Sequence, residues 1–126
     1  MKILSVDDSA MVRKIIKGAV EVLNYDFLEA RDGQETLSIL AKEHRNINLI
    51  LLDWNMPGMN GLQTLYAIKN HKDYSQIPVL MVTTEREKES VLDALKAGAT
   101  NYMTKPFTME DLKIKILECI PNGVKK

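Results

Sequence analysis

Five short apolar runs alternate with five amphipathic stretches along the 126 residues, and this alternation constrains the fold more than any other feature of the chain. The third run, LILL at residues 49–52, is apolar on both faces, which is typical of a strand covered on both sides in a parallel sheet. Strands that alternate with helices favour right-handed crossovers, with helices on both faces of one sheet. We therefore expect a single α/β domain over residues 1–126.

Local start and stop signals set the expected bounds of these elements. Ser9 can cap the first helix, Gly98 can end the fourth, and Pro78 suits the first position of the fourth strand, where its missing N–H matters least. The strands are expected at 3–6, 26–30, 49–52, 78–82 and 101–104, and the helices at 10–23, 34–43, 62–70, 87–97 and 109–120.

Composition excludes several classes of protein. Seventeen basic and seventeen acidic residues leave no net charge, so we expect neither a nucleic acid nor an anionic membrane as a partner. We find no apolar run of membrane-spanning length and no signal peptide at the N-terminus. The single Cys119 rules out an internal disulfide and agrees with a reducing cytoplasm. We expect no chemical role for Cys119, His44 or His71.

Polar side chains follow four of the five expected strands. They are Asp7 and Asp8 after the first strand, Asp53 after the third, Thr83 and Thr84 after the fourth, and Lys105 before Pro106 after the fifth. In an open α/β sheet, ligands bind outside the carboxyl ends of the strands. We therefore expect three carboxylates, a hydroxyl and an ammonium to lie at one edge of the sheet.

Such a cluster is suited to phosphoryl chemistry. Three carboxylates repel one another unless a cation intervenes, and Mg²⁺ prefers these hard oxygen ligands. Lys105 adds a positive charge for a second anion, such as a phosphoryl group. Asp53 could then be the nucleophile, because carboxylates form acyl-phosphate intermediates.

Four motifs resemble the receiver domains of two-component response regulators, in that family's order and spacing. They are VDDS at residues 6–9, DWNMPGMNG at 53–61, VTTE at 82–85 and AGATNYMTKPF at 97–107. The resemblance covers residues 1 to about 120 and is strongest to the CheY-type, single-domain chemotaxis regulators. It implies a flavodoxin-like, doubly wound five-stranded parallel sheet of order 2-1-3-4-5 with five helices.

The resemblance also assigns site residues. It implies that Asp53 is the phosphoacceptor and that Asp8, Asp53 and the backbone carbonyl of Asn55 ligate Mg²⁺, with Asp7 holding a metal-bound water. It implies that Lys105 pairs with Asp53 and then with the phosphate. In the family, the peptide bond between this lysine and the following proline is cis.

A switch and an output surface are implied in the same way. Thr83 would donate its hydroxyl to a phosphoryl oxygen, and the ring of Tyr102 would turn inward as the loop after the fourth strand moves. Val91, Leu95 and Lys115 would then bind a partner beside Tyr102. Val91 and Leu95 could instead be partly buried core residues.

Leu92 could serve the core beneath this surface. The resemblance implies that Asn55, Thr84 and Glu85 tune the phosphate lifetime, and Thr84 departs from the small residue that many receivers have at its position.

The resemblance implies a histidine kinase as phosphodonor. The chain ends at Lys126, so we expect no output domain and a monomer that signals by protein contact. The prime partner is the flagellar motor switch, with an auxiliary phosphatase possible. The alternative is a phosphorelay intermediate that passes its phosphoryl group to a histidine phosphotransfer protein.

Two other classes of protein fit the site less well. A flavodoxin would need a phosphate loop rich in Ser, Thr and Gly after the first strand, where Asp7 and Asp8 are acidic. A phosphatase of the haloacid dehalogenase type would need a second acid two residues after its nucleophile, where Asn55 stands.

Overall fold

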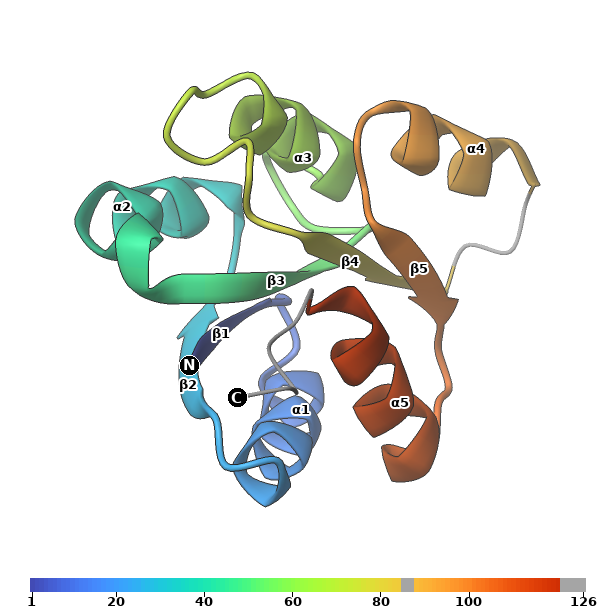
Figure 1. Ribbon diagram of the computed structural model, residues 1–126. Coiled ribbons are helices and arrows are strands. Elements are labelled where there is room, and N and C mark those ends of the chain that lie inside the picture. The colour runs from blue at the N-terminus through green and yellow to red at the C-terminus, as the bar shows by residue number, and fades with distance from the viewer. Residues whose placement is uncertain (85–87, 121–126) are drawn as a thin grey trace.

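The computed structural model describes residues 1–84 and 88–120, apart from the side chains of Lys88 and Glu89. Its strands form one parallel sheet of order β2-β1-β3-β4-β5 (Figure 1). The strands are β1 (Lys2–Val6), β2 (Asp26–Ala30), β3 (Ile47–Asp53), β4 (Val79–Thr83) and β5 (Asn101–Thr104). The α-helices are α1 (Ala10–Val22), α2 (Gly33–Glu43), α3 (Gly61–Lys69), α4 (Lys88–Lys96) and α5 (Met109–Cys119). The predicted fold class and strand order are confirmed.

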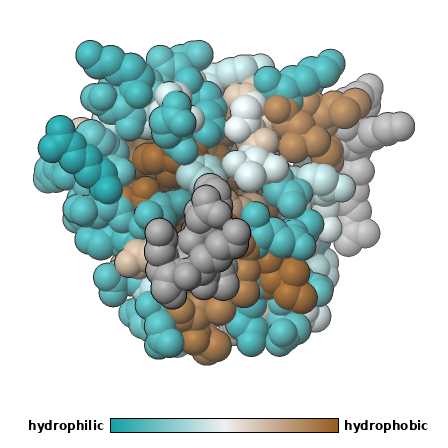
Figure 2. All heavy atoms as spheres, viewed as in Figure 1, coloured by the Kyte–Doolittle hydropathy of each residue, from teal (hydrophilic) through white to brown (hydrophobic). Residues whose placement is uncertain are grey.

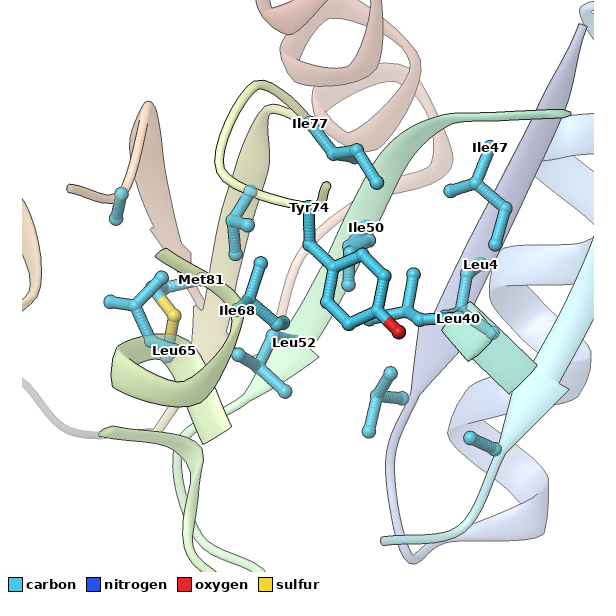
Figure 3. Close-up of a cluster of buried hydrophobic side chains, with 14 of the residues drawn as sticks. Leu4, Leu40, Ile47, Ile50, Leu52, Leu65, Ile68, Tyr74, Ile77 and Met81 are labelled. Atoms are coloured by element: carbon cyan, nitrogen blue, oxygen red, sulfur yellow. The ribbon is translucent and has the colours of Figure 1, made fainter. Parts of the chain in front are cut away.

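Helices cover both faces of the sheet, as the sequence predicts. Helices α2, α3 and α4 lie on one face, and α1 and α5 lie on the other (Figure 1). Alternate residues of β3 supply the two cores: Ile50 and Leu52 join the first cluster, while Leu49 and Leu51 join the second. Figure 3 shows the ring of Tyr74 within the first cluster. Strand β3 is therefore enclosed along its length, and its last residue, Asp53, is delivered to the edge of the sheet.

Side-chain caps fix where the helices begin. The hydroxyl oxygen of Ser9 accepts a hydrogen bond from the N–H of Val12 at the start of α1, which confirms the predicted cap. Asn60 and Gln63 form a reciprocal capping box at the start of α3, so this helix begins at Gly61 rather than at the expected Leu62.

Strands β2 and β5 have the expected bounds, whereas β1, β3 and β4 differ from them at the ends. Strand β3 begins at Ile47, which pairs with Lys2 of β1, and the side-chain oxygen of Asn48 accepts a 2.9 Å hydrogen bond from the N–H of Lys2 at the same point. Strand β4 begins after Pro78 and includes Thr83 as its last residue. Among the described residues, no helix combines the length and apolar character needed to cross a membrane.

Candidate functional site

Three carboxylates meet at the carboxyl edge of the sheet. Asp7 follows β1 and Asp53 ends β3, and these neighbouring strands pair Val6 with Leu52 just before the acids. Oxygens from Asp7, Asp8 and Asp53 all lie within 4.8 Å of one another. Asp7 and Asp53 are 1% and 4% exposed, whereas Asp8 faces solvent. The acidic cluster therefore forms as the sequence predicts, with one accessible and two buried members.

Lys105 supplies the positive charge beside these acids. Its ammonium lies 2.8 Å from Oδ2 of Asp7 and 3.3 Å from Oδ1 of Asp53. The backbone N–H of Lys105 donates a 2.7 Å hydrogen bond to the carbonyl of Thr83, and a cis peptide bond joins Lys105 to Pro106. Lys105 thus reaches the acids from the end of β5, as the sequence predicts.

The site disfavours a full set of negative charges. Burial and the nearby Asp7 carboxylate raise the pKa of Asp53 from 3.8 to about 6, and Lys105 offsets them only partly. Burial lowers the pKa of Lys105, but the hydrogen bond and charge of Asp7 and the charge of Asp53 outweigh it, so the net shift is upward. Ionised Asp53 is therefore held with incomplete charge compensation.

The donor set fits a hard divalent cation. Three carboxylates against one ammonium leave an excess of negative charge, which a divalent ion would neutralise. Of the three acids, Asp8 lines an open hollow of about 480 Å³, which it shares with Asn60 and residues 55–58 of the loop after β3. Carboxylate oxygens that lie so close together agree with a hard metal ion rather than a softer one.

Two residues that hold the site were not identified from the sequence. Nη1 of Arg13 donates a 2.6 Å hydrogen bond to the carbonyl of Asp7. Gly61 packs so closely on the turn after β3 that a Cβ there would collide with the carbonyl oxygen of Asp53 and lie 2.7 Å from Cα of Trp54. The Asn-Gly pair at residues 60–61 signals a turn, but neither contact can be read from spacing.

The residues around Asp53 lie as follows. Thr83 is buried at the end of β4, and Thr84 after it is exposed. The side chain of Asn55 is exposed, and its backbone contributes a hydrogen bond that opposes the rise in the pKa of Asp53. Glu85 lies outside the described residues.

Tyr102 stands between the site and the surface. It is 37% exposed and pairs with Met81 across β4 and β5. Together with Thr83 and Val91, it lines a small hollow of about 10 Å³. This is about the volume of one water probe, so the ring needs movement of its neighbours before it can turn inward.

The surface over α4 and α5 contains most of the predicted output residues. Lys115 and Tyr102 line a groove of about 370 Å³ between β5 and α5. Val91 is half-buried and Leu95 is 41% exposed. Figure 2 shows apolar residues reaching the surface over both helices.

The suggestion that Leu92 serves the core is wrong. Leu92 is 43% exposed, and the residue of α4 that packs into the first cluster is Ala94, at 1% exposed. Leu92 lies two positions before Ala94, roughly half a turn around the helix, so the face that packs Ala94 on the sheet leaves Leu92 on the outer side.

The fold and the acidic site define a class of signalling domain. A family model described as the response regulator receiver domain matches residues 3–117. The chain therefore belongs to the response regulator receiver domain family, and it is a signalling domain rather than a conventional enzyme.

Several chemotaxis proteins of this family are similar to the chain over nearly its whole length. A chemotaxis protein CheY homolog of Campylobacter jejuni is 44% identical over 124 residues, which cover 98% of this chain and 95% of the relative. Chemotaxis protein CheY1 of Helicobacter pylori is 44% identical over 117 residues, which cover 92% of this chain and 94% of the relative. The solved structure of chemotaxis response regulator CheY4 of Vibrio cholerae has a TM-score of 0.88 and 32% identity, covering 94% and 98%.

Proposed function

We propose that this chain is a phosphorylation-controlled chemotaxis regulator that accepts a phosphoryl group on Asp53 from a histidine kinase. One observation carries the proposal: Asp53 ends a buried strand beside Asp7, Asp8 and the ammonium of Lys105. A rigidly held carboxylate with a cation at 3.3 Å suits in-line attack on phosphorus.

The transfer is a simple substitution at phosphorus. An oxygen of Asp53 forms the new P–O bond, and the P–N bond of the kinase's phosphohistidine breaks as the imidazole leaves with the electron pair and takes up a proton. Lys105 moves its charge toward the phosphoryl oxygens, and the hydroxyl of Thr83 donates to one of them. Asp8, Asp53 and the carbonyl of Asn55 would hold Mg²⁺, with Asp7 acting through water, and the ion would supply positive charge against the phosphoryl oxygens.

Phosphorylation would act on the surface through Thr83. If Thr83 moves toward the phosphate, the hollow that it lines with Val91 and Tyr102 enlarges. The ring of Tyr102 can then turn inward from its partly exposed position, which changes the groove beside Lys115. This couples a local charge to a binding surface by a shift between two states.

The relatives support a chemotaxis role for that surface. These relatives are chemotaxis proteins, and we extend that role to this chain. The domain would act in the cytoplasm as a single unit over residues 1–126, a monomer that delivers its signal to a flagellar motor switch protein. Asn55, Thr84 and Glu85 would set the phosphate lifetime, with or without an auxiliary phosphatase.

The first test is intact-mass measurement after incubation with Mg²⁺ and acetyl phosphate. We expect a single phosphoryl adduct in the wild type and none in Asp53→Asn, with Asp93→Asn as a control on an exposed acid of α4. An equal adduct in Asp53→Asn would contradict the assignment. If the wild type shows none, beryllofluoride distinguishes a short-lived phosphate, which still permits activation, from an inert site.

The second test concerns the output. We expect the beryllofluoride-activated protein to bind a motor switch peptide more tightly than the untreated protein, and Lys115→Gln to weaken the activated complex. Rapid phosphoryl exchange with a histidine phosphotransfer protein, without tighter peptide binding, would favour the phosphorelay alternative instead.

A further inference from the structure

The guanidinium of Arg13 links three parts of the fold next to the acidic site. Arg13 lies in the first turn of α1, where its Nη1 reaches the carbonyl of Asp7 at 2.6 Å. Its Nε lies 2.7 Å from Oε1 of Glu29 on β2. The side chain of Arg13 is only 11% exposed, so the planar fork is held between these two partners.

Asp7 is fixed at every polar group that it carries. Its N–H donates to the carbonyl of Ala30 at 3.1 Å, and its Oδ1 accepts from the N–H of Ser9 at 2.9 Å. Its Oδ2 contacts Lys105 at 2.8 Å. The contact from Arg13 completes this set at the carbonyl oxygen, which belongs to the peptide bond that leads to Asp8.

The held carbonyl sets the direction in which the chain leaves β1. A peptide unit is planar, so fixing the oxygen of Asp7 also orients the N–H and Cα of Asp8. Asp8 is the exposed member of the acidic cluster. The position of its carboxylate therefore depends on the plane that Arg13 holds.

The position of Glu29 explains how the guanidinium is kept in place. Strand β2 pairs with β1 in the register that matches Glu29 with Ser5, two residues before Asp7. Glu29 also compensates the charge of Arg13. The Arg13–Glu29 pair therefore adds no net charge near the site, and its effect is to orient the groups that it contacts.

We propose that Arg13 is a positioning residue for metal binding: it orients the peptide between Asp7 and Asp8, and Glu29 holds its guanidinium in place. This inference rests on the proposed function, because it concerns the same Mg²⁺ site. Groups that orient metal ligands typically change metal affinity by about 10- to 100-fold when they are removed.

The test is a titration with Mg²⁺ alone, followed by the fluorescence of Trp54, which adjoins Asp53 and is half-buried. We expect Arg13→Gln and Arg13→Lys both to weaken Mg²⁺ binding by about tenfold, because lysine keeps the charge but loses the fork. Glu29→Gln should weaken it by a smaller factor. Lys17→Gln is the matched control, since it removes a positive charge from an exposed position of the same helix and should leave orientation unaffected.

The sign of the change separates positioning from electrostatics. If Arg13 acted only through its charge, Arg13→Gln would bind the cation more tightly and Arg13→Lys would resemble the wild type. Either result would overturn the proposal.

A purely structural role makes a different prediction. It would lower the urea midpoint of Arg13→Gln while leaving Mg²⁺ affinity within about twofold of the wild type, and that too would overturn the proposal. Should Arg13→Gln fail to fold, Arg13→Lys and Glu29→Gln decide the question.

The wild type distinguishes this inference from the proposed function. If the fluorescence of the wild type shows no saturable response to Mg²⁺, both the proposed function and the role of Arg13 are contradicted. A wild type that binds Mg²⁺, with Arg13 variants that bind equally well, would remove only the role of Arg13.

Discussion

Lys105 and Asp7 stand 98 positions apart in the chain and form an ion pair of 2.8 Å at the edge of the sheet. The same ammonium is 3.3 Å from Asp53. Lys105 is therefore nearer to Asp7 than to the proposed phosphoacceptor. Because the ammonium of Lys105 lies closer to Asp7, it neutralises the charge of Asp53 less completely, in agreement with the raised pKa of Asp53 of about 6.

The first prediction concerns stability without Mg²⁺. The pKa of Asp53 is raised from 3.8 to about 6 in the folded chain, so folding favours its protonated form. This contribution is full below pH 3.8 and is lost as the pH rises through about 6. Ionised Asp53 should therefore cost on the order of 3 kcal/mol at neutral pH. We expect Asp53→Asn to be more stable than the wild type by about 2–3 kcal/mol at neutral pH and by much less in acid.

Urea unfolding near pH 4 and near pH 8 measures this difference. Asp93→Asn on the surface of α4 is the control for removing a carboxylate. An Asp53→Asn advantage that stays constant with pH would contradict the predicted cause.

The second prediction concerns the pH dependence of metal binding. Because a ligand carboxylate must be deprotonated, Mg²⁺ competes with the proton on Asp53, whose pKa is about 6. We expect Mg²⁺ affinity to fall by about tenfold for each pH unit well below this pKa and to level off above it. Fluorescence titrations of Trp54 between acid and neutral pH would measure the slope. An affinity that does not change across this range would show that Asp53 is not the titrating ligand.

The third prediction compares the same substitution at two glycines. A Cβ at Gly61 would meet backbone atoms of Asp53 and Trp54, so the loop after β3 must shift in Gly61→Ala. We expect it to lose about 1–3 kcal/mol of stability and to impair phosphorylation of Asp53. Gly18 lies within α1, where a Cβ would make only an ordinary 3.6 Å contact with Met109.

Gly18→Ala should accordingly gain about 0.5–1 kcal/mol from helix propensity. Urea unfolding and acetyl-phosphate labelling of both variants test the contrast. Equal effects on stability would show that crowding at Gly61 is relieved without moving the loop.

The fourth prediction concerns the phosphate lifetime. Thr84 is exposed and directly follows the buried Thr83, and we expect its side chain to limit the access of water to the phosphoryl group. We expect Thr84→Ala to change the decay rate of phosphorylated protein while its unfolding midpoint stays the same. Thr100→Ala, at an exposed threonine before β5, is the control. Decay at the wild-type rate would rule out a screening role for Thr84.

The sequence predicts the sheet and its acidic edge because these depend on local patterns. Apolar runs that end in Asp7, Asp53 and Lys105 place those residues at one edge in any parallel sheet of this kind. The strand order came from the family resemblance, because periodicity carries no information about which strands are neighbours.

Contacts that depend on register and on helix rotation could not be predicted. The Arg13–Glu29 pair needs both the pairing of β1 with β2 and the position of α1 over it. The exposure of Leu92 depends on the rotation of α4 about its axis, which turns Ala94 toward the sheet. Val91, Leu92 and Leu95 are all apolar, so the sequence pattern of α4 does not show which of them faces solvent.

Strand β5 is a four-residue strand at the edge of the described sheet, next to β4, and Lys105 follows it immediately. The amide of Lys105 is bonded to the carbonyl of Thr83, whereas β3 is bonded on both sides at the centre of the sheet. Amide protons at the end of β5 should therefore exchange with solvent far sooner than those of β3. The side chain of Lys105 contacts the carboxylate of Asp53, so a change of charge on Asp53 should also change the exchange rate of the Lys105 amide proton. That exchange rate would therefore report whether the buried carboxylate is phosphorylated.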